Sequence, residues 1–201
     1  MDRERVWSLR KELAQISRRA FERDLVGGTG GNISARIPDT DRVLITPSGV
    51  SLGDVTPESI IMVDLEGSVI ESTLDYIPSK ETGFHLSVYR LRTDVLAIAH
   101  LHPPHATAYS ACVESLPLVT VSSRVVLKNV PRVECALPGS EALKGYVTEG
   151  IKKDPEVKAL LMREHGILAL GPDLKTAFYI ADLVEDTAKI AYLISNIKNI
   201  E

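Results

Sequence analysis

Two histidines, His100 and His102, stand two residues apart at the end of the apolar run 95–102. An extended strand places residues i and i+2 on the same face, so both imidazoles are expected to point the same way. The proline pair that follows stops the strand and leaves both histidines at its end. His165 lies much later in the chain, in a predicted turn before Gly166. Three neutral imidazoles around one open position are a common catalytic arrangement for Zn²⁺, so a metal site is one interpretation.

Simpler interpretations of the five histidines stay open at this point. Buried and helix-capping histidines are common, and the sequence alone does not show that His165 converges on His100 and His102. His105 is predicted to cap the helix that follows it, and His85 is predicted to pack one helical turn away from Glu81. Neither of these two is expected to bind a metal ion.

Glu81 is the candidate for acid–base chemistry. It lies near the start of a predicted helix, residues 79–90, for which Ser79 is the predicted N-cap. The positive end of a helix dipole keeps a nearby carboxylate ionised. A first-turn glutamate that only stabilises its helix is the alternative interpretation. Beside a metal ion, the same carboxylate could move a proton on a carbon acid.

The segment 27–32 reads GGTGGN and can direct backbone N–H groups at an anion. It follows a predicted helix and precedes a predicted strand, which is not the context of the nucleotide-binding glycine motifs, so nucleotide binding is disfavoured. A plain helix-to-strand connection is the alternative. Ser48, Gly49, Ser79 and Lys80 add hydroxyl, backbone and ammonium donors that suit a phosphate monoester.

The elements that must position these residues are helices mixed with mostly hairpin-connected strands. Amphipathic periodicity predicts a first helix that ends before Gly27 and a last helix from about Asp173. The expected strands are 32–37, 42–46, 60–64, 68–72, 95–102, 157–162 and 166–170, and the expected inner helices are 79–90, 105–112 and about 140–152. No repeat or linker is visible, so one domain over residues 1–201, of mixed α and β type, is expected.

Composition excludes several classes of protein. With 201 residues, 44% of them hydrophobic and 25% charged, the chain is long enough to bury a core and is not of a disordered type. The net charge of −4 disfavours a nucleic-acid partner, which requires a basic face. No apolar run approaches the ~18–20 residues that cross a bilayer, so no membrane partner is expected. Only two cysteines and a densely charged N-terminus favour the cytoplasm.

Five sequence blocks together resemble the class II aldolase/adducin family in their order and spacing. These blocks are residues 30–36, 45–49, 78–85, 99–108 and 164–171. The resemblance covers nearly the whole chain, and five blocks in the right order are far more specific than any one of them. It implies an α/β fold, a three-layer α-β-α sandwich with a central, mainly antiparallel sheet. It also implies a homotetramer with sites at the subunit interfaces.

The resemblance also implies roles for individual residues. His100, His102 and His165 match the family's three metal ligands, which normally hold zinc, with Mn²⁺ or Co²⁺ as other possible ions. Glu81 matches the acid–base carboxylate. The residues that match or adjoin the phosphate-binding positions are Gly31, Asn32, Ser48, Gly49, Ser79 and Lys80. A small phosphorylated sugar or sugar acid is therefore the expected substrate.

Among the reactions of this family, aldol cleavage of a ketose phosphate through a metal-stabilised enediolate is the expected one. Two departures leave other reactions open. Lys80 stands where family aldolases have a second serine, and in this it resembles members that decarboxylate 3-oxo-tetronate 4-phosphates. Val121 falls where the aldolases have a tyrosine acid. Sugar-phosphate 4-epimerases typically carry aspartate at the position of Glu81, and the non-catalytic adducin-like members lack the histidines that this chain keeps.

Overall fold

The computed structural model of the chain describes residues 3–73 and 75–198. The strands in these residues join one eight-stranded sheet, in the order β4-β3-β2-β1-β5-β8-β7-β6. They are β1 (Asn32–Arg36), β2 (Arg42–Ile45), β3 (Ile61–Asp64), β4 (Val69–Glu71), β5 (Ala97–Leu101), β6 (Arg132–Val133), β7 (Ala159–Met162) and β8 (Gly166–Gly171). Every neighbouring pair is antiparallel except β6 and β7, so the predicted, mainly antiparallel sheet is confirmed.

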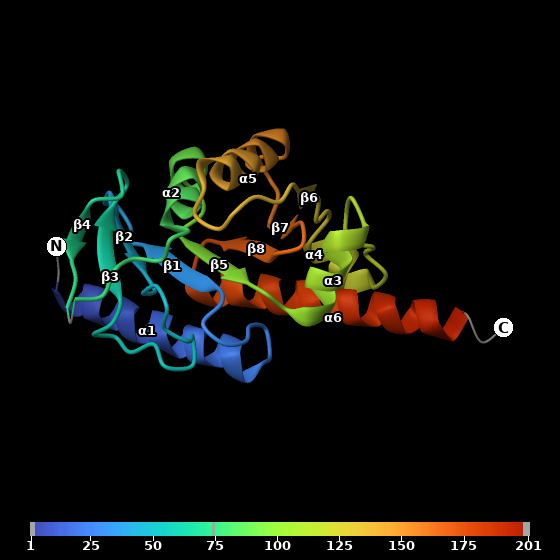
Figure 1. Cartoon of the computed structure of the whole chain (residues 1–201), viewed down its shortest axis with the longest axis horizontal. Coiled ribbons are helices and arrows are strands. Elements are labelled where there is room, and N and C mark those ends of the chain that lie inside the picture. Colours follow the sequence, from blue (N-terminus) through green and yellow to red (C-terminus); the bar gives the residue numbers. More distant parts are fainter. Residues whose placement is uncertain (1–2, 74, 199–201) are drawn as a thin grey trace.

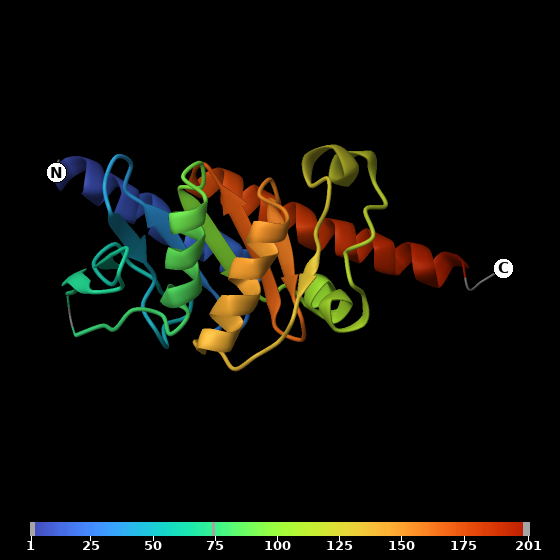
Figure 2. The same cartoon turned by 90° about the horizontal axis from the view of Figure 1, so that it is seen from above.

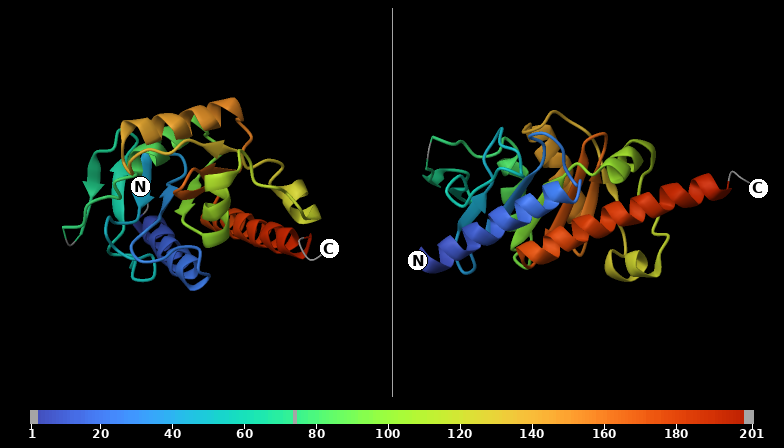
Figure 3. Two further views of the ribbon diagram at one scale, coloured as in Figure 1. Left: turned by 45° about the vertical axis from the view of Figure 1, so that its right-hand side comes forward. Right: turned by 90° about the horizontal axis from the view of Figure 1, so that it is seen from below.

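Helices cover both faces of this sheet (Figure 1). They are α1 (Arg3–Glu22), α2 (Thr82–Leu91), α3 (Pro104–Cys112), α4 (Val121–Val126), α5 (Glu141–Lys153) and α6 (Leu174–Lys198). Helices α2 and α5 lie side by side on one face (Figure 2), and α1 and α6 run across the other (Figure 3). The predicted three-layer sandwich is therefore confirmed. No helix in the described part of the chain has both the length and the apolar character that crossing a membrane requires.

The alternation of side chains along β5 explains how the two helical layers are held. Ala97, Ala99 and Leu101 belong to the core shared with α6, where the small alanines allow the helix to approach the sheet closely. Ile98 belongs to the second core, under α2 and α5, and His100 meets the ring of Phe84 from α2 on the same face. The central strand thus sends its histidines toward α2.

Two predicted helix starts are wrong. Helix α2 begins at Thr82 instead of Ser79, so Glu81 occupies the N-cap position, and Ser79 lies in the preceding turn, where its Oγ accepts a hydrogen bond from the Glu81 amide at 3.3 Å. Helix α3 begins at Pro104, so His105 lies within its first turn and does not cap it. The fixed φ of proline suits the first helical position, which explains the earlier start.

Two short elements were not predicted from the sequence. Helix α4 has six residues and is held at its start by a capping box, in which Thr120 and Ser123 exchange side-chain and backbone hydrogen bonds. Strand β6 has two residues and pairs in parallel with β7. Both lie in the segment between α3 and α5, to which the sequence pattern assigns no element.

Candidate active site

Three histidine rings meet where β5 ends and β8 begins. The centroid of the His100 ring lies 4.8 Å from those of both His102 and His165, and the latter two lie 5.0 Å apart. One potential ligand atom from each ring lies within 4.8 Å of the others. Because β8 is the antiparallel neighbour of β5, the turn before β8 lies beside the end of β5. The sheet order therefore brings His165 to the pair that the sequence singled out.

Hydrogen bonding and burial determine which nitrogen atoms of these imidazoles can face a metal ion. His100 Nδ1 lies 2.9 Å from the backbone oxygen of Ile167 and donates to it, so in the neutral ring the lone pair is on Nε2. Burial, with the nearby charge of His100, lowers the pKa of His102 to about 3 and that of His165 to about 4. Both rings are therefore neutral near pH 7, which is the form that binds metal ions.

Glu81 approaches the histidines from the start of α2 and is 6% exposed. Its Oε2 lies 3.1 Å from His100 Nε2 and accepts a hydrogen bond from Asn32 Nδ2 at 2.8 Å. Its Oε1 lies 3.4 Å from His165 Nε2 and receives no hydrogen bond from any residue that the structure describes. Burial alone would raise the pKa of Glu81, but the hydrogen bond and charge of His100, with Asn32 and His165, lower it to about 2. The carboxylate is therefore ionised.

The chemistry of these donors fits a divalent metal ion. His100 Nε2 lies 3.0 Å from His102 Nε2 and 3.1 Å from a Glu81 oxygen, so three atoms that bind cations converge on one point, where a positive charge stabilises the carboxylate. Three imidazole nitrogens with a carboxylate oxygen are ligands that Zn²⁺ and similar ions accept. The Ile167 carbonyl orients His100 in the way that outer hydrogen bonds orient metal ligands. The three-histidine group can therefore hold a metal ion.

Glycines pack tightly around the first two histidines. A Cβ atom at Gly30 would lie 2.7 Å from His102 Nδ1, and one at Gly166 would lie 2.7 Å from His102 Cδ2. Gly31 has a φ of +68°, and a Cβ there would lie 2.9 Å from the backbone oxygen of His100. The loop that was predicted to bind phosphate therefore also supports the histidine pair. Sequence reasoning missed this second role.

The other segments predicted to bind phosphate lie side by side. The amide of Ser48 donates to the backbone oxygen of Ile77 at 2.9 Å. The amide of Ser79 donates to the backbone oxygen of Thr46 at 3.3 Å. Both serines are half-buried, whereas Gly49, with a φ of +75°, and Lys80 are exposed. Ser48, Gly49, Ser79 and Lys80, four of the six residues predicted to bind phosphate, thus lie close together. They lie in two loops that these two backbone hydrogen bonds join, an arrangement called the loop pairing below.

The side chain of Asn32 is committed to the interior of the protein. Besides the bond from its Nδ2 to Glu81, its Oδ1 lies 2.6 Å from His85 Nε2, and the residue is 3% exposed. His85 therefore makes its contacts across to β1, where its Nδ1 lies 2.7 Å from Ser34 Oγ. Neither the support of Glu81 by Asn32 nor the part played by Ser34 was predicted from the sequence.

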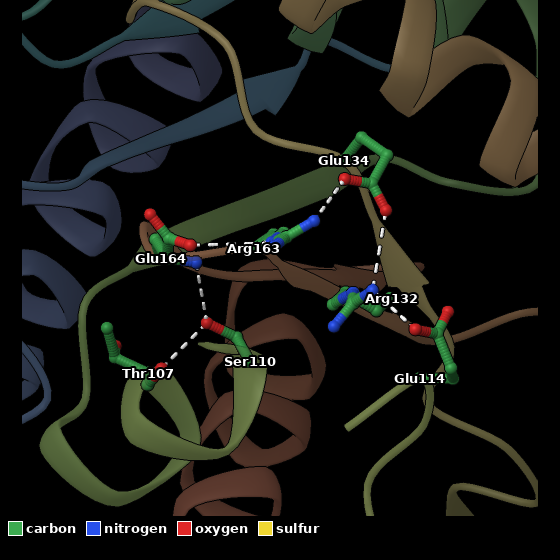
Figure 4. A network of polar contacts seen from close by, with 7 residues as sticks. All are labelled: Thr107, Ser110, Glu114, Arg132, Glu134, Arg163 and Glu164. Atoms are coloured by element: carbon green, nitrogen blue, oxygen red, sulfur yellow. Dashed lines mark hydrogen bonds and ion pairs between the residues drawn. The ribbon is translucent and has the colours of Figure 1, made fainter. Parts of the chain in front are cut away.

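The turn that carries His165 is anchored from two sides, as Figure 4 shows. The amide of Glu164 donates to Ser110 Oγ on α3 at 3.1 Å, and Arg163 pairs with Glu134 at 3.0 Å. Glu164 has a φ of +54°, a conformation that residues other than glycine adopt mainly in sharp turns. These contacts hold the turn at the end of β5.

His105 lies outside the three-histidine group. Its Nδ1 lies 2.7 Å from an oxygen of Glu185 on α6, and the same carboxylate accepts hydrogen bonds from the amides of His105 and Ala106, at 3.1 and 2.9 Å. Glu185 therefore caps the start of α3, and the prediction that His105 supplies this cap is wrong.

The fold and the site define a class of proteins, and comparison with known families supports the same class. The family model described as "Class II Aldolase and Adducin N-terminal domain" matches residues 11–192. The chain belongs to this family, as the five sequence blocks predicted, and the expected type of enzyme, a class II aldolase, is confirmed.

Individual relatives agree with this assignment over most of the chain. An L-fuculose phosphate aldolase of Methanococcus maripaludis is 34% identical over 187 residues, which cover 93% of this chain and 98% of that protein. A 3-oxo-tetronate 4-phosphate decarboxylase of Haemophilus influenzae is 34% identical over 197 residues, covering 94% and 89%. A solved structure of an L-fuculose 1-phosphate aldolase has a TM-score of 0.87 at 33% identity, covering 94% of this chain and 87% of that one.

Proposed function

We propose that this protein is a divalent-metal-dependent aldolase that cleaves a ketose phosphate, in the manner of L-fuculose phosphate aldolase. The observation that carries the proposal is the convergence of the buried, ionised Glu81 on His100, His102 and His165. Fold alone does not establish function, because one scaffold hosts several reactions. A carboxylate poised beside a possible metal site is, however, the arrangement that acid–base chemistry at a carbon requires.

The three histidines would hold the metal ion, and we propose zinc, with Mn²⁺ or Co²⁺ as alternatives. When bound, the ion supplies a Lewis acid that stabilises negative charge developing on the substrate's oxygen atoms. Glu81 moves the proton: its Oε1, which accepts no hydrogen bond within the described residues, takes a proton from the carbon next to the carbonyl in aldol addition and returns it in cleavage.

The substrate phosphate is proposed to lie near the exposed loop pairing on the side of Glu81. Ser48 and Ser79 offer hydroxyls and Gly49 an amide. The family resemblance adds Gly31 and Asn32 from the glycine loop. Lys80 adds a positive charge. Anchoring the phosphate would fix the reacting carbon against Glu81, which supplies much of the rate advantage of an oriented reaction.

A half-reaction tests this proposal directly. Cleaving a ketose 1-phosphate between C3 and C4 releases dihydroxyacetone phosphate, so the metal-loaded protein should exchange one carbon-bound proton of that compound with deuterated water without any aldehyde. Glu81→Gln should abolish the exchange and leave the metal content unchanged. Glu141→Gln, at an exposed position in α5, is the control. Exchange at the wild-type rate in Glu81→Gln would contradict the proposal.

A second reaction, decarboxylation of a 3-oxo acid phosphate, has a specific observation in its favour. The Lys80 ammonium is exposed and makes no hydrogen bond or ion pair within the part of the chain that the structure describes, so it is available to a substrate carboxylate. Loss of CO₂ needs no acid at the leaving group, which agrees with Val121 at the place of the expected tyrosine. The relative from Haemophilus influenzae carries this activity in its name.

Product analysis separates the two reactions. A panel of ketose 1-phosphates and 3-oxo-tetronate 4-phosphates should be assayed for aldehyde and for CO₂. We expect aldehyde release as the main reaction. CO₂ release that is lost in Lys80→Met, without aldehyde from any ketose phosphate, would replace the aldolase by the decarboxylase.

We further propose a homotetramer with its sites at subunit interfaces, located in the cytoplasm. The last turns of α6 extend past the sheet in Figure 1 and carry Ile197, which is 62% exposed. Val121 and Val125 on α4 are 70% and 69% exposed, and apolar surface of this kind is typical of contact regions. Cys112 and Cys135 are free and exposed, which suits a reducing compartment. A monomeric mass in solution would contradict the tetramer.

A further inference from the structure

Two regularly spaced sets of polar side chains face each other between α2 and β1. Glu81, at the N-cap of α2, is followed at intervals of four residues by His85 and Tyr89 on the helix, and Asn32 and Ser34 are two residues apart on β1. Four residues of helix rise by ~6 Å and two residues of strand by ~6.6 Å, so the two sets keep step with each other. Their side chains therefore alternate along one line under the helix.

Hydrogen bonds join these five side chains into a single chain. Tyr89 Oη lies 2.7 Å from Ser34 Oγ, which lies 2.7 Å from His85 Nδ1. His85 Nε2 lies 2.6 Å from Asn32 Oδ1, and Asn32 Nδ2 lies 2.8 Å from Glu81 Oε2. All five residues are buried, and none is more than 6% exposed. The chain ends on the carboxylate that faces the three histidines.

The chemistry of the donors determines the direction of every bond. The ionised Glu81 can only accept, so the amide nitrogen of Asn32 must face it and the amide oxygen must face His85. His85 Nε2 therefore carries the proton and donates. Complete burial, with the charge of His100, lowers the pKa of His85 to about 3, so the ring is neutral and its Nδ1 accepts from the Ser34 hydroxyl. Ser34 Oγ in turn accepts from Tyr89, whose pKa burial raises, so that its hydroxyl keeps its proton.

Burying polar side chains in a core costs free energy unless each polar group finds a hydrogen-bond partner. On the same face of the neighbouring strands, apolar residues fill the core instead, with Ile98, Leu168 and Leu170 packed under the helices. The five polar residues follow a line that leads to Glu81. This placement indicates that they serve the carboxylate.

We propose that His85 is a positioning residue for Glu81, acting through Asn32, and that its Nε2 proton sets the orientation of the Asn32 amide. The inference rests on the proposed function of Glu81. With the amide held in this orientation, Oε2 of Glu81 is fixed by Asn32 and Oε1 is left free beside His165. A rotated amide would turn its oxygen toward the carboxylate and repel it.

The protonation state of His85 can be observed without any activity. Nitrogen-15 NMR of metal-free protein labelled in histidine should show His85 as a neutral ring with its proton on Nε2 and a hydrogen-bonded, unprotonated Nδ1 near pH 7. The spectrum of His85→Gln identifies the signal by its loss. A proton on Nδ1, or a charged ring, would overturn the proposed direction of the chain.

Two conservative variants separate positioning from packing. The side-chain amide of glutamine can place its nitrogen where His85 Nε2 lies, whereas that of asparagine reaches only the place of Nδ1. In the dihydroxyacetone phosphate exchange, His85→Asn should lower the maximal rate by about 10- to 100-fold, as loss of an outer hydrogen bond typically does. The half-saturating concentration and the metal content should stay unchanged, and His85→Gln should recover most of the rate.

Controls keep the two proposals distinguishable. Ser87→Ala removes a hydroxyl that donates to the Gly83 oxygen and accepts from Arg90, both within α2, and this variant should exchange at the wild-type rate. If His85→Asn matches wild type while Glu81→Gln is inactive, the positioning role fails and the proposed function stands. If Glu81→Gln is fully active, the proposed function fails. Equal rates in His85→Asn and His85→Gln, both below wild type, would also overturn the role of the Nε2 proton. If His85→Asn does not fold, Ser34→Ala takes its place with the same expected loss of rate, and the NMR result still decides the direction.

Discussion

At the scale of single residues, His85 links the stability of the protein to pH. In an unfolded chain histidine titrates near pH 6.5, whereas in the folded protein burial, with the charge of His100, lowers the pKa of His85 to about 3. Between these two values the unfolded chain binds more protons than the folded one. The contribution of the neutral ring to stability is therefore fully present above pH 6.5 and is lost as the pH falls toward 3.

We expect this linkage to be visible in denaturation of the metal-free protein. The urea midpoint of the wild type should fall more steeply between pH 6 and pH 4 than that of His85→Gln, because the glutamine has no proton to bind. His102 and His165, whose pKa values are also lowered, are present in both proteins, so the difference between the two profiles reports His85. Parallel pH profiles of the two proteins would contradict the expectation.

Substitution of a glycine tests whether the packing of Gly30 against His102 positions the His102 ring. Gly30→Ala would place a methyl group 2.7 Å from His102 Nδ1, so the ring must move, and zinc affinity should fall by about 10-fold or more. Gly27→Ala is the matched control, since it lies in the same loop and its new Cβ would meet nothing within 4 Å. Competition with a coloured chelator measures both affinities. Equal affinities in the two variants would show that His102 tolerates the displacement.

Some residues of the candidate site could be predicted from the sequence and others could not, for a physical reason. Histidines two apart at a strand end and a glutamate at a helix start are typical of chemistry, and the structure brings His100, His102, His165 and Glu81 together. His85 was interpreted only as a packing residue. Polar residues at helical or strand spacing are usual on exposed faces, and no local pattern states that two such sets meet in the interior.

At the scale of elements, the start of α3 depends on a residue from the other end of the chain. Helices begin with amide groups that have no partner within the helix, and α3 begins with prolines that cannot cap it through a side chain. Glu185 on α6 accepts from the amides of His105 and Ala106 and also contacts the His105 ring. Helix α3, which follows β5 and His102, is thereby connected to α6.

Removing the charge of Glu185 should loosen this connection. Glu185→Gln should lower the free energy of unfolding by about 0.5–2 kcal/mol, the usual cost of losing a helix cap. Glu149→Gln is the control, because its ion pair with Lys152 is exposed on both sides and such pairs contribute at most ~1 kcal/mol. Urea denaturation compares them. Equal losses in the two variants would mean that the cap contributes no more than a surface ion pair.

Helices and strands were predicted correctly where the spacing of their apolar residues repeats over enough positions to be recognised. The strands and helices around the site were predicted to within a few residues, whereas α4 and β6, with six and two residues, are too short to show a period. The start of α2 was placed at Ser79 because serine is a favoured cap. In the folded protein the backbone of Ser79 bonds to the segment before Ser48, a contact that only the tertiary structure supplies.

At the scale of the whole molecule, the candidate metal site unites β5, the turn before β8 and the start of α2. The ligands lie together only when these elements are in place, so an ion that binds there stabilises the folded state. Zinc at 100 times its dissociation constant should add about 2.7 kcal/mol to the free energy of unfolding.

Thermal denaturation with and without zinc measures this effect. The rise in melting temperature should disappear in His165→Asn and persist in His105→Asn, which removes a histidine that lies outside the group. An equal rise in both variants would place the bound zinc elsewhere.

The order of the strands and the three layers could not be derived from periodicity, which identifies elements but not their neighbours. The three layers came from the family resemblance and are confirmed by the structure, whereas the order of the strands was not predicted and is a finding of the structure. The single domain over 1–201 and the tetramer stay predictions. One sheet holds every strand of the described residues, but a subunit interface depends on surfaces of other copies.

The place of β5 between β1 and β8 has a consequence for synthesis on the ribosome. One neighbour, β1, leaves the ribosome before β5, but β5 ends at Leu101 and β8 begins only at Gly166, 65 residues later. At rates of about 5–20 residues per second, β5 therefore waits roughly 3–13 s for its second partner. During that time an apolar strand with an open edge is exposed to other nascent chains. The step that completes the histidine group is also the step that closes this vulnerable edge.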